Sequence, residues 1–152
     1  MKQLILLLVL LAACSSTSEK APAEFQLGTL SNETLANGES GTQGVQTFTF
    51  PEELEANQLY LNGTWDFTEE YAESLSEETS VAFEVDANAV HVLASASTAA
   101  TLEVWVDGAA IETFTVSDKN LYPLAEGLDP GLHSLTIKVK GKGFKAFAFT
   151  FD

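Results

Sequence analysis

The sequence contains no arginine, and its seven cationic residues are all lysines, set against 22 aspartates and glutamates. The formal net charge is −15, and no lysine occurs between Lys20 and Lys119. An acidic surface repels the phosphate backbone of nucleic acids, so we expect no nucleic-acid partner. This charge pattern is typical of a solvated face that keeps a protein soluble, with a cation-binding or basic-partner site as the alternative.

Cysteine is nearly absent as well, because Cys14 is the only one in the chain. One cysteine excludes an intramolecular disulfide, a CxxC redox pair and a cysteine-based zinc site. The sequence also lacks the GxSxG and HExxH motifs and a phosphate-binding glycine loop. We therefore expect neither an enzyme nor a bound cofactor.

The first thirteen residues have the composition of a secretory signal peptide. A positive start, Met1–Gln3, is followed by an aliphatic run, Leu4–Leu11, and by the small residues Ala12 and Ala13. The aliphatic run is far shorter than the roughly 20 residues that a membrane-spanning helix needs. We interpret residues 1–13 as a signal peptide.

The residues at the expected cleavage point, Leu11-Ala12-Ala13-Cys14, resemble the lipobox of bacterial lipoproteins. This resemblance implies cleavage before Cys14, a diacylglycerol on its sulfur and an acyl chain such as palmitate on its amine. Two or more chains anchor a protein stably, at about 0.8 kcal/mol per buried methylene. We expect a membrane-anchored protein of the cell envelope, and Ser15 implies the outer membrane in a Gram-negative cell. An ordinary signal peptide with an incidental cysteine is the alternative.

The chain after the signal peptide divides into a tether and a domain. Ser15–Ala23 has no apolar periodicity and too little hydrophobic surface to order itself, so we expect residues 14–24 to form a flexible, lipidated tether. The folded domain is expected over residues 25–152, which is within the usual size of one domain.

Apolar and polar residues alternate with a period of two along most of this domain, which predicts β-strands. Asp107-Gly108, a dipeptide favoured in type I′ hairpin turns, joins two such strands. Thr68–Glu78 is an exception that predicts either a short acidic helix or an exposed loop. Short strands without a long helical period predict an all-β fold, a single jelly-roll-like β-sandwich. The alternating segments include Val45–Phe50, Leu59–Leu61, Val81–Val85, Val90–Leu93, Leu102–Val106, Ile111–Val116, His133–Lys140 and Phe147–Phe151.

Several ordered motifs resemble the C-terminal domain of DipZ-type thioredoxin-like membrane proteins. The resemblance implies a β-sandwich like that of carbohydrate-binding modules, and with it a binding role. The family's redox chemistry cannot be transferred, because this chain has no CxxC motif. The matching motifs are Leu59–Trp65, Glu70–Ser74, Ala89–Leu93, Val104–Gly108, Leu121–Leu124, His133–Leu135 and the aromatic stretch Gly143–Phe151.

Two tryptophans are the candidate ligand-binding residues, because a flat aromatic side chain can stack on the apolar face of a sugar ring. Trp105 alternates with the apolar residues of its strand, so we expect it on the outer sheet face with Glu103 and Asp107, unless a loop covers it. Trp65 follows a polar turn and is the second candidate, with core packing as the alternative. Its expected neighbours in a cleft at the loop end are Asp66, Glu70 and Tyr71.

Metal binding has little support in the sequence. His91 and His133 lack the spacing of metal ligands, and we expect both to be structural. A structural calcium ion is an open alternative, for which Asp86 and Asn88 offer oxygen ligands.

The sequence as a whole predicts a non-catalytic, lipid-anchored envelope module that binds carbohydrate or another polar polymer. The main alternative is a protein-interaction accessory of an envelope thiol-disulfide system, with a thioredoxin-like redox protein as partner. A third hypothesis is a glycoside hydrolase that uses a pair of the many carboxylates.

Overall fold

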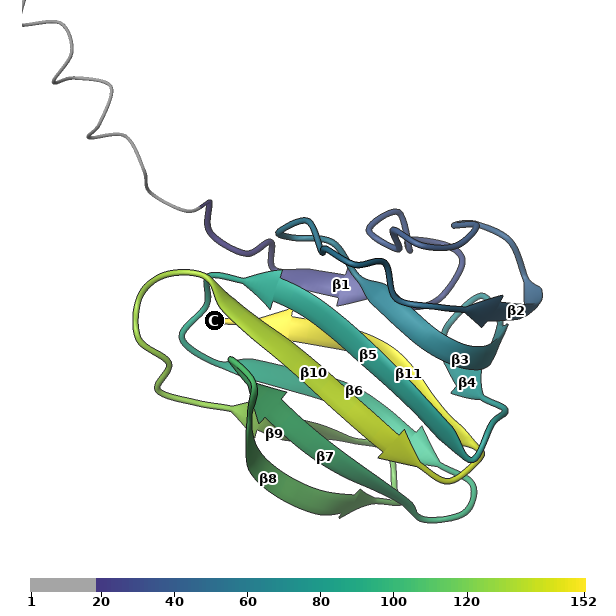
Figure 1. The fold of residues 1–152 in the computed structure, drawn as a ribbon. Coiled ribbons are helices and arrows are strands. Elements are labelled where there is room, and N and C mark those ends of the chain that lie inside the picture. The colour runs from purple at the N-terminus through teal and green to yellow at the C-terminus, as the bar shows by residue number, and fades with distance from the viewer. Residues whose placement is uncertain (1–18) are drawn as a thin grey trace, which may run out of the picture.

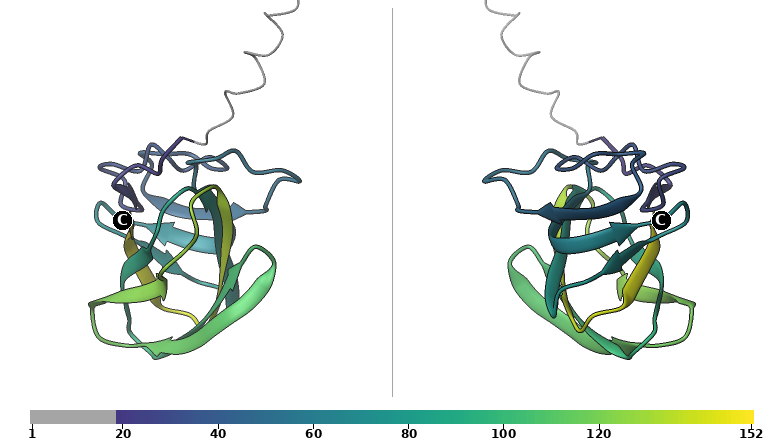
Figure 2. Two further views of the ribbon diagram at one scale, coloured as in Figure 1. Left: turned by 90° about the vertical axis from the view of Figure 1, so that its left-hand side faces the viewer. Right: turned by 90° about the vertical axis from the view of Figure 1, so that its right-hand side faces the viewer.

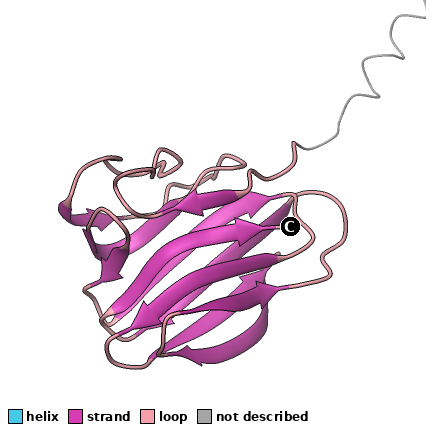
Figure 3. Cartoon of the chain, turned by 180° about the vertical axis from the view of Figure 1, so that it is seen from behind, coloured by secondary structure: helices cyan, strands magenta, loops and turns pink. Residues whose placement is uncertain are grey.

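The computed structural model describes residues 19–152, and every regular element in that range is a β-strand (Figure 3). The all-β fold predicted from the sequence is confirmed. Within residues 19–152 there is no helix of the length and hydropathy that a membrane span requires. The expected signal peptide, Cys14 and the expected tether as far as Ser18 lie outside the described residues. The eleven strands are β1 (Glu24–Gln26), β2 (Gly44–Phe48), β3 (Tyr60–Phe67), β4 (Ala72–Ser74), β5 (Glu78–Val85), β6 (Val90–Ala96), β7 (Ala100–Val106), β8 (Ala109–Val116), β9 (Asn120–Ala125), β10 (His133–Lys140) and β11 (Phe144–Phe151).

The strands form two antiparallel sheets that share β3. The front sheet, nearer the viewer in Figure 1, has the order β8-β7-β10-β5-β3. The back sheet continues from β3 through β4, β11 and β6 to β9, while β2 pairs with β3 and β1 with β11. Because β3 pairs with strands of both sheets, the strands nearly enclose a common interior (Figure 2).

The core lies between the two sheets and is built by the alternation seen in the sequence. In β7 and β10 the inward residues Leu102, Val104, Leu135 and Ile137 are fully buried. The largest buried side chains include Phe25, Phe83 and Phe149, whose rings meet edge to face. Each fully buried side chain of this kind contributes about 1.5–3 kcal/mol through the hydrophobic effect. In β7 and β10 the outward alternates remain at least partly exposed, as in an antiparallel sheet with one wet face.

The segment Thr68–Glu78 forms no helix, which corrects one of the two sequence interpretations. The hydroxyl of Thr68 accepts hydrogen bonds from the backbone N–H groups of Glu70 and Tyr71, which closes a turn. A threonine side chain that bonds to nearby backbone competes with helix formation in this way. The chain then enters the short strand β4 and, after a second turn, β5 at Glu78.

The hairpin between β7 and β8 is the turn that the sequence predicted. Asp107 and Gly108 have φ angles of 50° and 84°, as a type I′ turn requires at both central positions. After this turn the chain returns as β8, which pairs with β7 and is the edge strand of the front sheet.

Strand β11 departs from simple alternation, because its pairing with β6 shifts register between Ala146 and Ala148. Phe147 is the extra residue of this bulge. Phe144 and Phe149 are buried, whereas Phe147 is partly exposed and turned out of the core. Regular alternation over the predicted segment Phe147–Phe151 would place Phe147, Phe149 and Phe151 on one face, and the bulge separates Phe147 from the other two.

The chain enters the domain beside the last strand. The Ala21 N–H donates to the carbonyl of Asp86 at 3.2 Å, and the Phe151 N–H donates to the carbonyl of Ala23 at 3.1 Å. The N-terminal segment therefore approaches the sandwich at the end of β11, as the start of β1 in Figure 1 shows.

Candidate functional site

The candidate site is the outer surface of the front sheet, where outward side chains of neighbouring strands stand side by side. Residues directly opposite each other in an antiparallel pair share one face. Glu103 of β7 stands opposite Lys138 of β10, and Lys138 stands opposite Ser80 of β5. Trp105 stands opposite Thr136. We call this surface the front face and define it by Thr101, Glu103, Trp105, Thr136, Lys138, Lys140, Ser80 and Asn62.

Trp105 is partly exposed and lies out of phase with its buried neighbours, as its alternation predicted. Its indole Nε1 donates a hydrogen bond of 2.6 Å to Glu103 Oε1. The ammonium of Lys138 lies 4.4 Å from the centre of the indole ring, in a cation–π contact. The indole is thus held between a carboxylate and an ammonium group on an otherwise hydroxyl-rich sheet surface.

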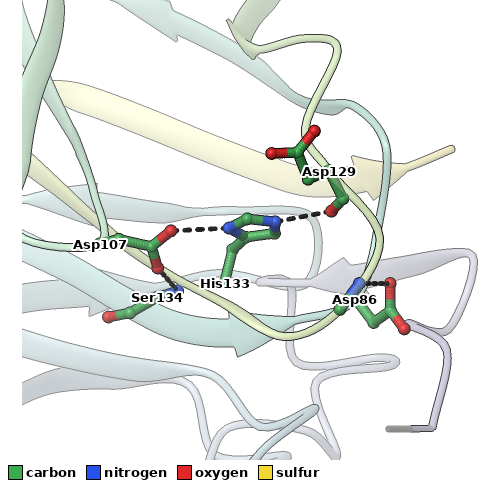
Figure 4. A network of polar contacts seen from close by, with 6 residues as sticks. Asp86, Asp107, Asp129, His133 and Ser134 are labelled. Atoms are coloured by element: carbon green, nitrogen blue, oxygen red, sulfur yellow. Dashed lines mark hydrogen bonds and ion pairs between the residues drawn. The ribbon is translucent and has the colours of Figure 1, made fainter. Parts of the chain in front are cut away.

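Asp107 does not share this environment, although the sequence grouped it with Trp105. It occupies the hairpin turn, where Oδ1 accepts a 2.9 Å hydrogen bond from the Ser134 N–H and Oδ2 lies 2.7 Å from His133 Nδ1 (Figure 4). Both carboxylate oxygens therefore hold the turn to the beginning of β10. Asp107 is thus a structural anchor of the turn, and its role as a ligand contact stays a prediction.

His133 is held from both sides. Its Nδ1 faces the Asp107 carboxylate and its Nε2 lies 2.7 Å from the carbonyl oxygen of Asp129. These two acceptors, the Asp107 carboxylate first, raise the pKa of His133 above its ordinary value of 6.5. The Ser134 N–H, and after it His133, lower the pKa of Asp107 below 3.8. His133 is a satisfied structural histidine.

The second histidine lies elsewhere on the fold. His91 Nε2 lies 3.5 Å from a Glu126 carboxylate oxygen on the outer side of β6. Across residues 19–152 no group of three or more histidines, cysteines or acids is arranged to hold a metal ion.

Trp65 is a core residue, which confirms the core-packing alternative and corrects its assignment as a ligand contact. Its side chain is completely buried, and its ring meets Phe144 edge to face. The indole Nε1 donates to the carbonyl of Asn62, so its polar atom is satisfied inside the protein. The three residues grouped with Trp65 in the sequence, Asp66, Glu70 and Tyr71, form no common cleft with it. Asp66 is partly exposed on β3, while Glu70 and Tyr71 line an open depression of about 270 Å³ with Thr68.

Asp86 and Asn88, the calcium candidates, lie near the chain entry. The buried Asp86 carboxylate accepts a hydrogen bond from the Gly131 N–H at 3.1 Å and pairs with Lys20 at 3.3 Å. Both residues line a depression of about 310 Å³ with Lys20, Ala87 and Phe151. An ammonium group and a backbone N–H thus both engage Oδ1 of Asp86. Calcium binding stays a prediction.

Lys138 is the front-face residue that sequence reasoning missed. The alternation in β10 places it on an outward face, but the pairing of β10 with β7 connects segments about thirty residues apart. That pairing is decided by the tertiary fold. A lysine at an outward strand position carries no local signal of the aromatic ring that it meets.

Comparison with known proteins places this geometry in context. No curated protein sequence matches the chain at a significant level. Among solved structures, it is similar to a family two carbohydrate esterase from Clostridium thermocellum in complex with cellohexaose, with a TM-score of 0.54, 18% identity, and coverage of 58% of this chain and 29% of the esterase. An active-site mutant of such an esterase gives a TM-score of 0.55 and 15% identity, with coverage of 73% and 32%. The chain therefore spans about a third of these enzymes.

A third similar structure is the carbohydrate-binding module CBM36 in complex with calcium and xylotriose, with a TM-score of 0.37, 14% identity, and coverage of 78% of this chain and 100% of the module. Identities this low concern the fold and leave the activity open. The family is decided by sequence. Residues 22–152 match the thioredoxin-like C-terminal domain family, and the chain therefore belongs to it.

Proposed function

We propose that this chain is a non-catalytic binding module of the cell envelope, anchored through lipid on Cys14, and that its front face binds carbohydrate or another polar polymer. The observation that carries the proposal is the partly exposed Trp105, with Glu103 and Lys138 in contact with its ring system. An exposed indole on an otherwise polar sheet face has no role in the core.

The chemistry of this face suits a polyhydroxylated ligand. The apolar face of a sugar ring would stack on the indole, while its hydroxyl groups would bond to Glu103, Lys138 and Thr136. Lys138 has a long, flexible side chain, so its ammonium can move from the ring to a ligand hydroxyl. The stack supplies contact area and the charged groups supply orientation.

The comparisons support this reading at the level of the fold. The similar esterase structures contain cellohexaose, which makes a linear glucan a suitable first probe. Family membership by itself assigns no ligand, because the match names a domain and no chemistry.

Calorimetric titration with cellohexaose and with peptidoglycan fragments tests the proposal. We expect the protein to bind at least one of these glycans, and we expect Trp105→Ala to weaken that binding at least tenfold. Leu132→Ala is the matched control, because Leu132 is 44% exposed and lies outside the front face. Absence of binding at millimolar glycan, or binding by the Trp105→Ala variant equal to that of the wild type, would contradict the proposal.

A second candidate function is a protein-interaction role beside an envelope thioredoxin-like protein. It is favoured by membership in a family named for thioredoxin-like proteins, in a chain that has no CxxC motif of its own. Cross-linking in intact cells, followed by mass spectrometry of the captured proteins, tests it. Recovery of a protein with a CxxC motif supports this role, and its absence from the cross-linked set counts against it.

A further inference from the structure

The outer surface of the back sheet carries an apolar strip, in contrast to the polar front face. Leu93 of β6 stands opposite Leu121 of β9, and the bulge of β11 brings Phe147 next to Leu93. The Phe147 ring contacts Tyr71, with 5.2 Å between ring centres. All four side chains are at least partly exposed, and Leu121 is 48% exposed. We call this surface the back face and define it by Tyr71, Leu93, Leu121 and Phe147 with Lys119 and Lys145.

The β11 bulge is what gives the back face its aromatic centre. In a regular strand without a bulge, Phe147 and Phe149 would point to the same side of the sheet. With it, Phe149 stays in the core while Phe147 joins the outer surface. A bulge that re-aims one side chain is commonly found at functional surfaces. An outward apolar strip on an antiparallel sheet is unusual, because that face normally meets water.

Two lysines complete the back face. The Lys119 ammonium lies 4.1 Å from the centre of the Phe147 ring, and the Lys145 ammonium lies 5.1 Å from the centre of the Tyr71 ring. Both ammonium groups thus lie over aromatic rings of the back face. At membrane interfaces a lysine can lay its aliphatic stem along apolar surface and direct its ammonium to the headgroups. In a chain of net charge −15, this small apolar surface carries two of the seven lysines, and Glu73 stands opposite Lys145 in the pairing of β4 with β11.

The tether places the back face within reach of a lipid anchor. Phe151, which bonds to Ala23 where the chain enters the domain, lies four residues along β11 from Phe147, or about 13 Å at the usual strand rise. Seven peptide units join Cys14 to Ala21, and covalent geometry limits their span to about 25 Å. Such a tether keeps the entry of the domain within about 25 Å of a lipid on Cys14, so a surface near that entry can contact the membrane.

We propose that the back face rests on the phospholipid surface of the membrane, with its aromatic and leucine side chains at the boundary between headgroups and acyl chains. Lys119 and Lys145 then reach lipid phosphates, which zwitterionic and anionic phospholipids both carry. The contact is an interfacial one, in which apolar area and cationic side chains act together. This inference rests on the lipid anchor of the proposed function. Because the two sheets face opposite ways, it leaves the front face open to a ligand.

Depth-dependent fluorescence quenching on vesicles tests the orientation. The lipidated protein is reconstituted into phosphatidylethanolamine–phosphatidylglycerol vesicles that carry a nitroxide-labelled lipid. Leu121→Cys supplies a labelling site on the back face for an environment-sensitive dye, since a lipidated Cys14 offers no free thiol. Thr113→Cys is the matched control, because Thr113 is exposed on the edge strand β8 opposite Glu103. We expect the label at position 121 to be quenched several-fold more strongly than the label at 113.

Further measurements separate the outcomes. Protein that fails to float with the vesicles contradicts the lipid anchor itself. Protein that floats with equal quenching at both positions contradicts the orientation and leaves the anchor and the front face intact. A third measurement uses the double variant Lys119→Gln/Lys145→Gln. If its quenching at position 121 equals that of the protein with both lysines, the role of the lysines is contradicted. A label at 121 that is shielded in native envelope but not on vesicles would assign the back face to a protein partner and overturn the proposal.

Discussion

At the residue scale, the Asp107–His133–Asp129 contacts make stability depend on pH. Both imidazole nitrogens face acceptor oxygens at 2.7 Å, and a neutral imidazole has only one N–H to donate. The cationic ring alone satisfies both contacts. His133 therefore stabilises the junction of the hairpin turn and the loop before β10 through its charged form.

The direction of the pH dependence follows from the two pKa shifts. The pKa of His133 is raised, so its contribution is complete below pH 6.5 and is lost as the pH rises through the raised pKa. The pKa of Asp107 is lowered, so its contribution is present above pH 3.8 and is lost as the pH falls through the lowered pKa. We expect this pair to stabilise the fold most strongly between pH 4 and pH 6.5.

Urea unfolding of the wild type and of His133→Gln at pH 5.5 and pH 8.5 checks this expectation. The substitution should destabilise the protein more at the lower pH than at the higher one. His91→Gln serves as the control, because its partner Glu126 is a separate, more exposed contact. Equal losses at both pH values for His133→Gln would contradict the assigned role.

At the scale of single elements, the turns and the bulge decide where side chains point. The Asp107-Gly108 turn was readable because its dipeptide has a strong local preference. The bulge at Phe147 was not, because it depends on how β11 meets β6. A local sequence pattern can predict a turn, whereas a register shift depends on the pairing of two strands.

Two glycines differ in the same way, because Gly108 serves a local turn whereas Gly28 is required by a contact with a distant segment. This difference leads to a stability prediction. A Cβ at Gly28 would overlap the backbone of Glu69 and Glu70, whereas a Cβ at Gly108 would meet nothing within 4 Å. Gly28→Ala should therefore cost about 3 kcal/mol, at the upper end of overpacking effects, since backbone must move. Gly108→Asn should cost less than about 1 kcal/mol, because asparagine tolerates a positive φ. Denaturant midpoints of the two variants provide the comparison, and a reversed order would contradict the close approach of Gly28 to the β3–β4 turn.

At the scale of the whole molecule, the two sheets offer unlike surfaces. The front face is polar around one indole, and the back face is apolar around two rings capped by lysines. One module can in this way hold a ligand on one side and a membrane on the other.

The anchor that this arrangement needs is tested by Cys14→Ser. We expect the wild type to incorporate radiolabelled palmitate and to sediment with the membrane fraction. The variant should lose the label and should leave that fraction. A wild type that incorporates no palmitate and leaves the membrane fraction as the variant does would identify the N-terminal pattern as an ordinary signal sequence.

The sequence by itself determined the fold class, the positions of most strands and the family, whereas β1, β4 and β9 were not among the predicted strand segments. These follow from local properties, namely period-two alternation, turn dipeptides and ordered motifs. All three can be recognised without knowing which strands pair. It also determined that Trp105 faces outward, since Leu102, Val104 and Val106 fix the phase of β7.

The tertiary structure alone decided which residues meet. It buried Trp65, drew Asp107 to His133, and set Lys138 over Trp105. The reason is physical: each of these outcomes depends on contacts between segments distant in sequence, and strand order and register are set by the packing of the entire core. The bulge in β11, which turns Phe147 toward the membrane-facing surface that we propose, belongs to the same class.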